Sequence, residues 1–99
     1  MEDTKIIDLY FERNEAAITE TDQKYGAYCR SIAWNILQNH EDSEECVSDT
    51  WLRAWNAIPP QRPEPLAPYA LRLCKNIAVS RMRTILAQKR SGYEIALDE

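Results

Sequence analysis

Residues 42 to 58 carry apolar side chains at three- and four-residue steps, which is the spacing of one face of an α-helix. The stripe consists of Cys46, Val47, Thr50, Trp51, Ala54, Trp55 and Ile58. Acidic residues occupy the first two turns, where negative charge meets the positive end of the helix dipole, and Asp42 or Ser43 is the expected N-cap. Pro59 and Pro60 remove two amide donors and end the helix. This segment therefore predicts one amphipathic helix with an acidic start.

The same spacing recurs in three other segments, and no segment has the alternation typical of a strand. The spacing predicts helices over residues 3–12, from about 15 to 38, and from Pro65–Pro68 to about Lys89. Ser91–Gly92 is expected to end the last of them. All five prolines lie between positions 59 and 68, so the loop before the last helix should be stiff. The prediction is an all-α fold, a small helical bundle of about four helices.

Length and side-chain inventory exclude several classes of protein. Ninety-nine residues suit one domain with one core. No run approaches the roughly 18 apolar residues of a membrane span, and the N-terminus lacks a signal-peptide pattern, so we expect a cytoplasmic protein with no membrane contact. Cys29, Cys46 and Cys74 are widely spaced and accompany a single His40, which predicts buried reduced thiols and no metal site. Without a Gly-rich phosphate loop or a Ser/His/Asp set, we expect neither an enzyme nor a cofactor.

The net charge of −4 conceals an uneven distribution of charge. Residues 1–58 hold five Lys/Arg and twelve Asp/Glu, a net of −7, whereas residues 59–93 hold seven Lys/Arg and one acid, a net of +6. An all-positive helix face favours phosphate contact over a merely solvated surface. A chain divided in this way can also meet a basic protein with its acidic part. The polar side of the last predicted helix carries Arg72, Asn76 and Arg83, flanked by Lys75 and Arg81.

Two long blocks carry a resemblance to a known family. They are EDSEECVSDTWLRAW at residues 41–55 and PLAPYALRLCKNIAVSRMR at residues 65–83. The first resembles the core-binding helix, and the second the promoter-recognising helix, of region 2 in bacterial RNA polymerase sigma factors of the extracytoplasmic-function (ECF) type, within the sigma-70 family. The resemblance is close over about residues 25–90. The chain departs from the family pattern with Ser48 in place of Gln, Ser80 in place of Asp, and Tyr69, preceded by Pro68, in place of Trp.

The resemblance implies a transcription initiation factor domain that docks on the clamp helices of the polymerase β′ subunit and recognises and melts the promoter −10 element. It implies three partners: the RNA polymerase core, the non-template single strand of promoter DNA, and an anti-sigma factor. Residues that fall at the family's core-polymerase contacts are Glu45, Ser48, Asp49 and Arg53. Residues that fall at its DNA contacts are Gln61, Arg62 and Glu64 in the base-capturing loop, and Arg72, Lys75, Asn76, Ser80, Arg81 and Arg83 on the last helix.

The resemblance also predicts a domain boundary. Residues 1–92 are expected to form the region 2 helical domain, and residues 93–99 to begin the linker to a C-terminal domain that recognises the −35 element and is absent from this chain. The residues themselves leave one alternative open. A helical protein–protein interaction adaptor with no nucleic-acid role could hold two proteins on its acidic and basic faces, and failure to bind any −10-type single strand would favour it.

Overall fold

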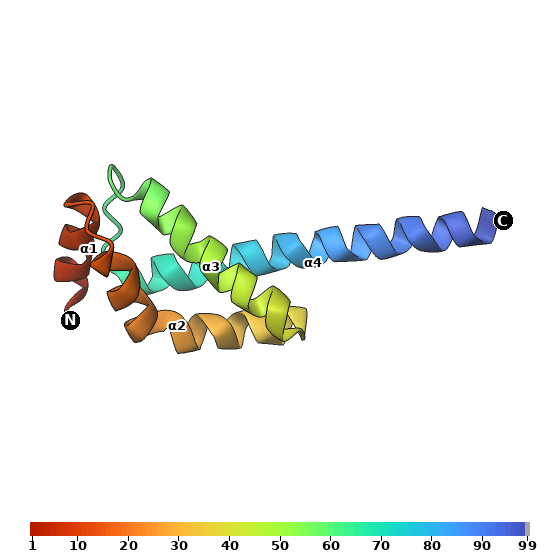
Figure 1. Cartoon of the computed structure of the whole chain (residues 1–99), viewed down its shortest axis with the longest axis horizontal. Coiled ribbons are helices and arrows are strands. Elements are labelled where there is room, and N and C mark those ends of the chain that lie inside the picture. Colours follow the sequence, from red (N-terminus) through yellow and green to blue (C-terminus); the bar gives the residue numbers. More distant parts are fainter. Residues whose placement is uncertain (99) are drawn as a thin grey trace.

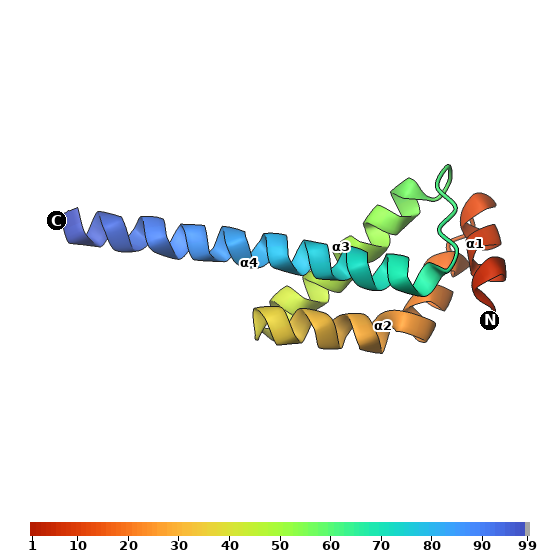
Figure 2. The ribbon, with the colours of Figure 1, turned by 180° about the vertical axis from the view of Figure 1, so that it is seen from behind.

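The computed structural model describes residues 1–98, and the side chains of residues 1–90. Helices α2 and α3 pack against each other and against the first half of α4. Helix α1 lies across the end of the bundle at which α2 and α4 begin (Figure 1). The second half of α4 extends beyond the other helices, as Figure 2 shows from behind. The predicted all-α bundle is confirmed for the described residues. Its helices are α1 (Asp3–Phe11), α2 (Ala16–Leu37), α3 (His40–Ala57) and α4 (Leu66–Asp98).

Three cysteines, one from each long helix, meet in the core. The Cys46 and Cys74 sulfurs lie 3.9 Å apart, and the Cys74 thiol donates to the carbonyl oxygen of Cys29 at 3.4 Å. All three are buried and free, which confirms that they pack as small hydrophobic side chains. Burial raises the pKa of the Cys46 thiol above its ordinary value. These small side chains allow α2, α3 and α4 to approach closely.

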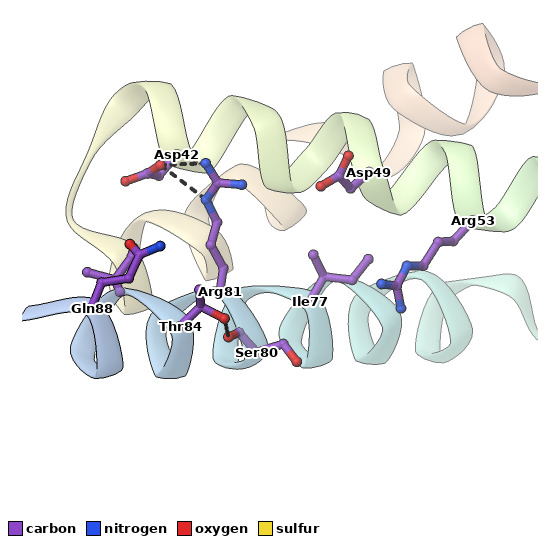
Figure 3. A pocket seen from close by; sticks show the side chains of 9 residues that line it. Asp42, Asp49, Arg53, Ile77, Ser80, Arg81, Thr84 and Gln88 are labelled. Carbon is purple, nitrogen blue, oxygen red and sulfur yellow. Dashed lines mark hydrogen bonds and ion pairs between the residues drawn. The ribbon is translucent and has the colours of Figure 1, made fainter. Parts of the chain in front are cut away.

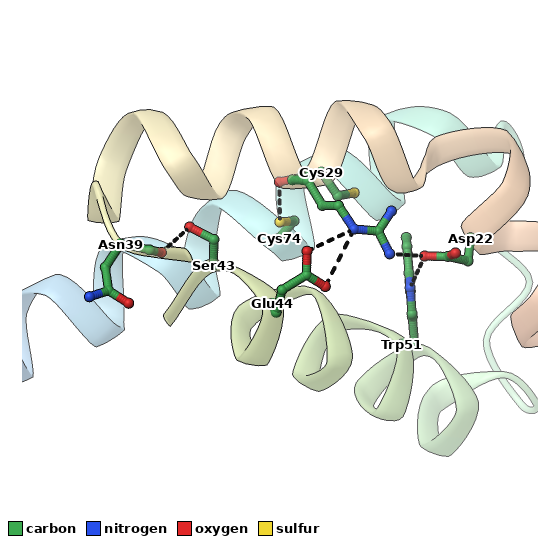
Figure 4. Close-up of polar contacts among 8 residues, drawn as sticks. Asp22, Cys29, Asn39, Ser43, Glu44, Trp51 and Cys74 are labelled. Atoms are coloured by element: carbon green, nitrogen blue, oxygen red, sulfur yellow. Dashed lines mark hydrogen bonds and ion pairs between the residues drawn. The ribbon is translucent and has the colours of Figure 1, made fainter. Parts of the chain in front are cut away.

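A polar network joins α2 to α3 beside this contact (Figure 4). The Arg30 guanidinium donates to Asp22 at 3.0 Å and to Glu44 at 3.1 Å. The indole nitrogen of Trp51 donates to the same Asp22 oxygen at 3.0 Å. Nearby carboxylates raise the pKa of Arg30, against the opposing effect of its desolvation. The network therefore sets the position of α3 along α2.

The start of α3 differs from the prediction. Asn39 is the N-cap, with an extended backbone and a side-chain oxygen that accepts from the Asp42 amide at 2.9 Å. Ser43 is buried and its hydroxyl donates to the Asn39 carbonyl at 2.7 Å. The predicted cap at Asp42 or Ser43 is wrong because Asn39 follows the left-handed Gln38, where the chain turns, and the helix begins directly after it.

The end of α4 also differs. The helix continues through Ser91–Gly92, where the sequence predicted its end, and reaches Asp98. A glycine inside a helix costs only about 1 kcal/mol relative to alanine. The residues after it include Glu, Ala and Leu, which favour helix, and no proline follows. A single glycine is therefore too weak a signal to end this helix.

Replacing Asn39 by Ala removes the acceptor for the Asp42 amide. We expect the free energy of unfolding in urea to fall by about 1 kcal/mol, with Asn39→Asp retaining most of the stability. The control is Asn35→Ala at an exposed position in the last turn of α2, which should change stability by less than about 0.5 kcal/mol. Equal losses in Asn39→Ala and Asn35→Ala would contradict the assignment of the cap.

Candidate functional site: the groove between α3 and α4

The outer face of α3 carries all four residues that the sequence placed at the polymerase contact. Each of them is exposed: Glu45, Ser48, Asp49 and Arg53. Leu52 lies among them with 57% of its surface exposed, and the sequence analysis did not select it. A single exposed leucine is ordinary on a protein surface. Because Leu52 lies within this polar group, it is a candidate contact. The sequence could have indicated its exposure, since Leu52 lies outside the apolar stripe of the helix.

A hollow of about 470 Å³ lies between α3 and α4 (Figure 3). The side chains of Asp49 and Arg53 reach it from α3, and that of Ser80 from α4. The hollow therefore brings residues of the predicted polymerase contact next to residues of the predicted DNA contact. Its full lining is Asp42, Asp49, Arg53, Ile77, Ser80, Arg81, Thr84, Ile85 and Gln88.

Arg81 crosses one end of this hollow to the acidic start of α3. Its Nε and Nη2 atoms donate to Asp42 Oδ1 at 3.1 and 2.7 Å, and Nη2 also pairs with Glu45. The hydrogen bond to Asp42 raises the pKa of Arg81 above its ordinary value. Ion pairs at this degree of exposure typically contribute only about 0.2–1 kcal/mol each. The structure thus places Arg81 against two acids instead of on an open face, and its DNA contact stays a prediction.

The other residues of α4 that are predicted to contact DNA are exposed to solvent. Arg72, Asn76 and Arg83 follow one another at steps of four and seven residues, which places them on one side of the helix. Lys75 and Ser80 are exposed as well. Within residues 1–90, no ion pair involves Arg72, Lys75 or Arg83. The positive charge of this face is therefore available to an external anion.

The proline-rich loop is tied to α1 by Arg62. Its guanidinium pairs with Asp8 at 3.0 Å and with Glu64 at 3.2 Å, and it lies 5.2 Å from the centre of the Phe11 ring. The hydrogen bond to Asp8 raises the pKa of Arg62. Gln61 and Glu64 are exposed, as is Arg62 itself. Arg62 therefore holds the loop against α1, while Gln61 lines a hollow together with Tyr69 and Leu73 of α4.

A second hollow, of about 450 Å³, separates this loop from the start of α4. Burial raises the pKa of the half-buried Tyr69, whose ring forms part of its wall. Asn56 and Gln61 add two amide groups, each able to donate and accept hydrogen bonds. An aromatic face beside amides suits a planar, hydrogen-bonding group such as an unpaired nucleobase. The lining residues are Arg53, Asn56, Ala57, Gln61, Tyr69 and Leu73.

Arg13 fixes the end of α3 that leads into this loop. Its Nη1 atom donates to the carbonyl oxygens of Trp55 and Ile58 at 2.8 and 2.7 Å, and its guanidinium lies 3.7 Å from the centre of the Trp55 ring. A cation at a helix C-terminus satisfies free carbonyls and complements the dipole. The sequence analysis missed this contact because it joins residues more than forty positions apart.

Arg13→Ala should destabilise the domain by about 1–2 kcal/mol, because two carbonyl oxygens lose a charged donor. Arg13→Lys should recover only part of this, since an ammonium group lacks the planar fork of the guanidinium. Urea denaturation measures both effects. Arg53→Ala is the control, because Arg53 is exposed on the same helix and no ion pair within residues 1–90 involves it. A stability unchanged in Arg13→Ala would show that the cap is unimportant.

Among the described residues, no group of three or more His, Cys, Asp or Glu side chains could hold a metal ion. None of the helices formed by residues 3–98 is both long enough and apolar enough to cross a membrane.

The family described as sigma-70 region 2 matches residues 23–87, which is well over half of the 99 residues and includes α3, the proline-rich loop and most of α2. No curated protein and no solved structure matches the chain. Every residue that lines the second hollow, and all but Gln88 of the first, lies within the matched range.

Proposed function

Because the chain belongs to the sigma-70 region 2 family, we propose that α3 binds RNA polymerase and that α4 binds promoter DNA during transcription initiation. Domains of this family bind RNA polymerase and recognise the promoter −10 element, and the chain is such a transcription initiation domain. In our proposal, α3 docks on the clamp helices of the β′ subunit, while α4 and the proline-rich loop hold the melted non-template strand. Family membership favours this function over an adaptor with no nucleic-acid role.

The proposal extends to the setting in which the domain works. The block at residues 41–55 supports an ECF-type sigma factor, which acts in the cytoplasm by binding and has no catalysis of its own. Residues 93–99 would begin the linker to a domain that recognises the −35 element. An anti-sigma factor is a further proposed partner, on the strength of the same resemblance.

The polymerase side of the proposal rests on the exposed face of α3. Asp49 is exposed and makes no ion pair with the described side chains, so its carboxylate is available to a basic partner. Leu52 offers apolar area one turn away. An apolar residue surrounded by charges is the arrangement that protein interfaces use, with the charges setting orientation.

Asp49→Arg should weaken binding to a β′ clamp-helix fragment by about tenfold or more, which corresponds to about 1.4 kcal/mol, because it reverses a charge that meets the basic partner. Leu52→Glu should have a similar effect through lost apolar contact. The matched controls are Glu12→Arg, exposed near the end of α1, and Leu86→Glu, half-exposed on α4. Calorimetry with the fragment gives all four affinities. Equal losses in the control variants would argue against docking on α3.

The DNA side of the proposal is carried by one observation: Leu73 lines the second hollow, and the adjacent Arg72 is exposed and makes no ion pair with the described side chains. A base that leaves the stack costs a few kcal/mol. Stacking on an aromatic ring returns about 1–3 kcal/mol per base, so Tyr69 offsets part of the cost. Hydrogen bonds from Asn56 and Gln61, and phosphate contacts to Arg72 and Arg83, would supply the remainder. The cost of unstacking and the gain from these contacts are of similar size. The site should therefore bind an unpaired base most readily in a −10 element that melts easily.

Arg72→Ala combined with Arg83→Ala should weaken binding of a −10-type single-stranded DNA. The slope of log affinity against log salt should become shallower by about 1.4, since each lost phosphate contact contributes about 0.7. Fluorescence anisotropy over a salt titration measures both quantities. Lys5→Ala, which removes an exposed cation from α1, is the control and should leave the slope unchanged. A slope unaltered in the double variant would count against DNA binding by this face.

A further inference from the structure

We propose that α1 and the turn that ends it position the proline-rich loop for base capture, with Asp8 and Arg13 as the positioning residues. This inference rests on the proposed function, and it gives a role to a helix that lies outside the matched residues 23–87. The loop and α1 lie side by side in both views of the ribbon (Figure 1 and Figure 2). Two contacts join this end of the molecule to the chain on either side of Gln61, which lines the second hollow.

The first contact comes from Arg13, whose backbone is left-handed with a φ of 56°. The hydrogen bonds that end α1 form a turn in which this position is usually a glycine. An arginine there has an unfavourable backbone, which its side-chain contacts offset. Those contacts reach the carbonyl oxygens of Trp55 and Ile58 and the ring of Trp55. They therefore fix the chain three residues before Gln61.

The second contact holds the loop one residue after Gln61. The Arg62 guanidinium pairs with Asp8 at 3.0 Å and lies 5.2 Å from the centre of the Phe11 ring, so two side chains one turn apart on α1 share it. The Arg62 and Asp8 side chains are 42% and 54% exposed, and an ion pair of this kind adds little stability by itself. Because the prolines already limit the conformations of the loop, a weak contact is enough to select one of them.

Helix α1 is itself fixed to the bundle and can therefore support the loop. Ile6, Ile7 and Tyr10 are fully buried. The Tyr10 hydroxyl lies 2.8 Å from the hydroxyl of Thr21 on α2, and its ring centre lies 6.2 Å from that of Trp55 on α3. One side of α1 thus packs against the bundle, while its exposed side contacts the loop.

The consequence is a binding hollow whose loop wall is held in place before a base arrives. Gln61 lies between the two contacts and shares the hollow with Tyr69. A base stacked on Tyr69 needs the Gln61 amide within hydrogen-bonding distance, and a loop free to move would lose conformational entropy on capture. Contacts from α1 should therefore strengthen base capture without touching the DNA.

The test separates base capture from binding of the DNA backbone. Fluorescence anisotropy compares a −10-type single strand with the same strand carrying one abasic site, at the position where the wild-type domain loses most affinity. The capture ratio is the affinity for the intact strand divided by that for the abasic strand. For the wild-type domain we expect a ratio of about five or more, because stacking of one base is lost.

Arg13→Gly should lower the capture ratio to less than about two and leave the affinity for the abasic strand within about twofold of wild type. Glycine adopts the left-handed backbone freely, so this variant should lose less stability than Arg13→Ala although it removes the same contacts. The matched control is Glu12→Gly at the neighbouring exposed position, which makes no ion pair with the described side chains and should keep the wild-type ratio. Urea denaturation checks that each variant is folded.

Reversal of the ion pair tests the second contact. Arg62→Asp should lower the capture ratio, and addition of Asp8→Arg should restore most of it, because the pair forms again with its charges exchanged. A direct phosphate contact by Arg62 would give another result. Arg62→Asp would then weaken both strands equally, make the salt slope shallower by about 0.7 and resist rescue, which would overturn the positioning role.

A capture ratio unchanged in either Arg13→Gly or Arg62→Asp would also overturn the inference, and base capture by the second hollow would then stand without α1. If no abasic site weakens binding to the wild-type domain, base capture itself is wrong and the inference falls with it. Weaker strand binding in Arg72→Ala with Arg83→Ala would in that case still support DNA binding by the basic face of α4.

Discussion

The position of α3 between α2 and α4 is the constraint on which the rest of the structure depends. The helices meet through small side chains, with Cys74 at the centre in contact with both Cys46 and the backbone of Cys29. Protein cores are packed at crystal-like density, so larger side chains there would move α3 outward. Close approach has an electrostatic consequence as well. It brings the acidic start of α3 within reach of arginines on both neighbours, Arg30 on α2 and Arg81 on α4.

The acidic and basic segments of the sequence are therefore only partly separated in the folded domain. Much of the negative charge at the start of α3 is compensated by those two arginines, and the compensation orients the helix. Fewer charges remain available than the sequence suggests: the Asp49 carboxylate on α3, and Arg72 and Arg83 on the exposed face of α4. Such a surface can bind two partners, because each partner would contact a small set of uncompensated charges beside an apolar or aromatic side chain.

Sequence reasoning succeeded where the signal was local. Apolar residues at three- and four-residue steps located all four helices, and the same spacing assigned the thiols to the core. It failed where the deciding partner is distant in the chain, as with the cap that Arg13 provides for α3 and the ion pairs of Arg81. It also failed where similar signals competed, since Asn39, Asp42 and Ser43 all suit an N-cap. Leu52 could have been identified as exposed, because it lies outside the stripe that its own helix buries.

The central claim is that the second hollow and the neighbouring basic face of α4 receive an unpaired DNA strand. The most direct test is a titration of the isotope-labelled domain with a −10-type single-stranded DNA, followed by amide chemical shifts in NMR spectra. We expect the perturbed amides to cluster at the second hollow and the basic face, around Gln61, Tyr69 and Arg72, with the exposed face of α2 around Tyr28 unchanged. Perturbations centred on α2, or spread evenly over all four helices, would contradict the account.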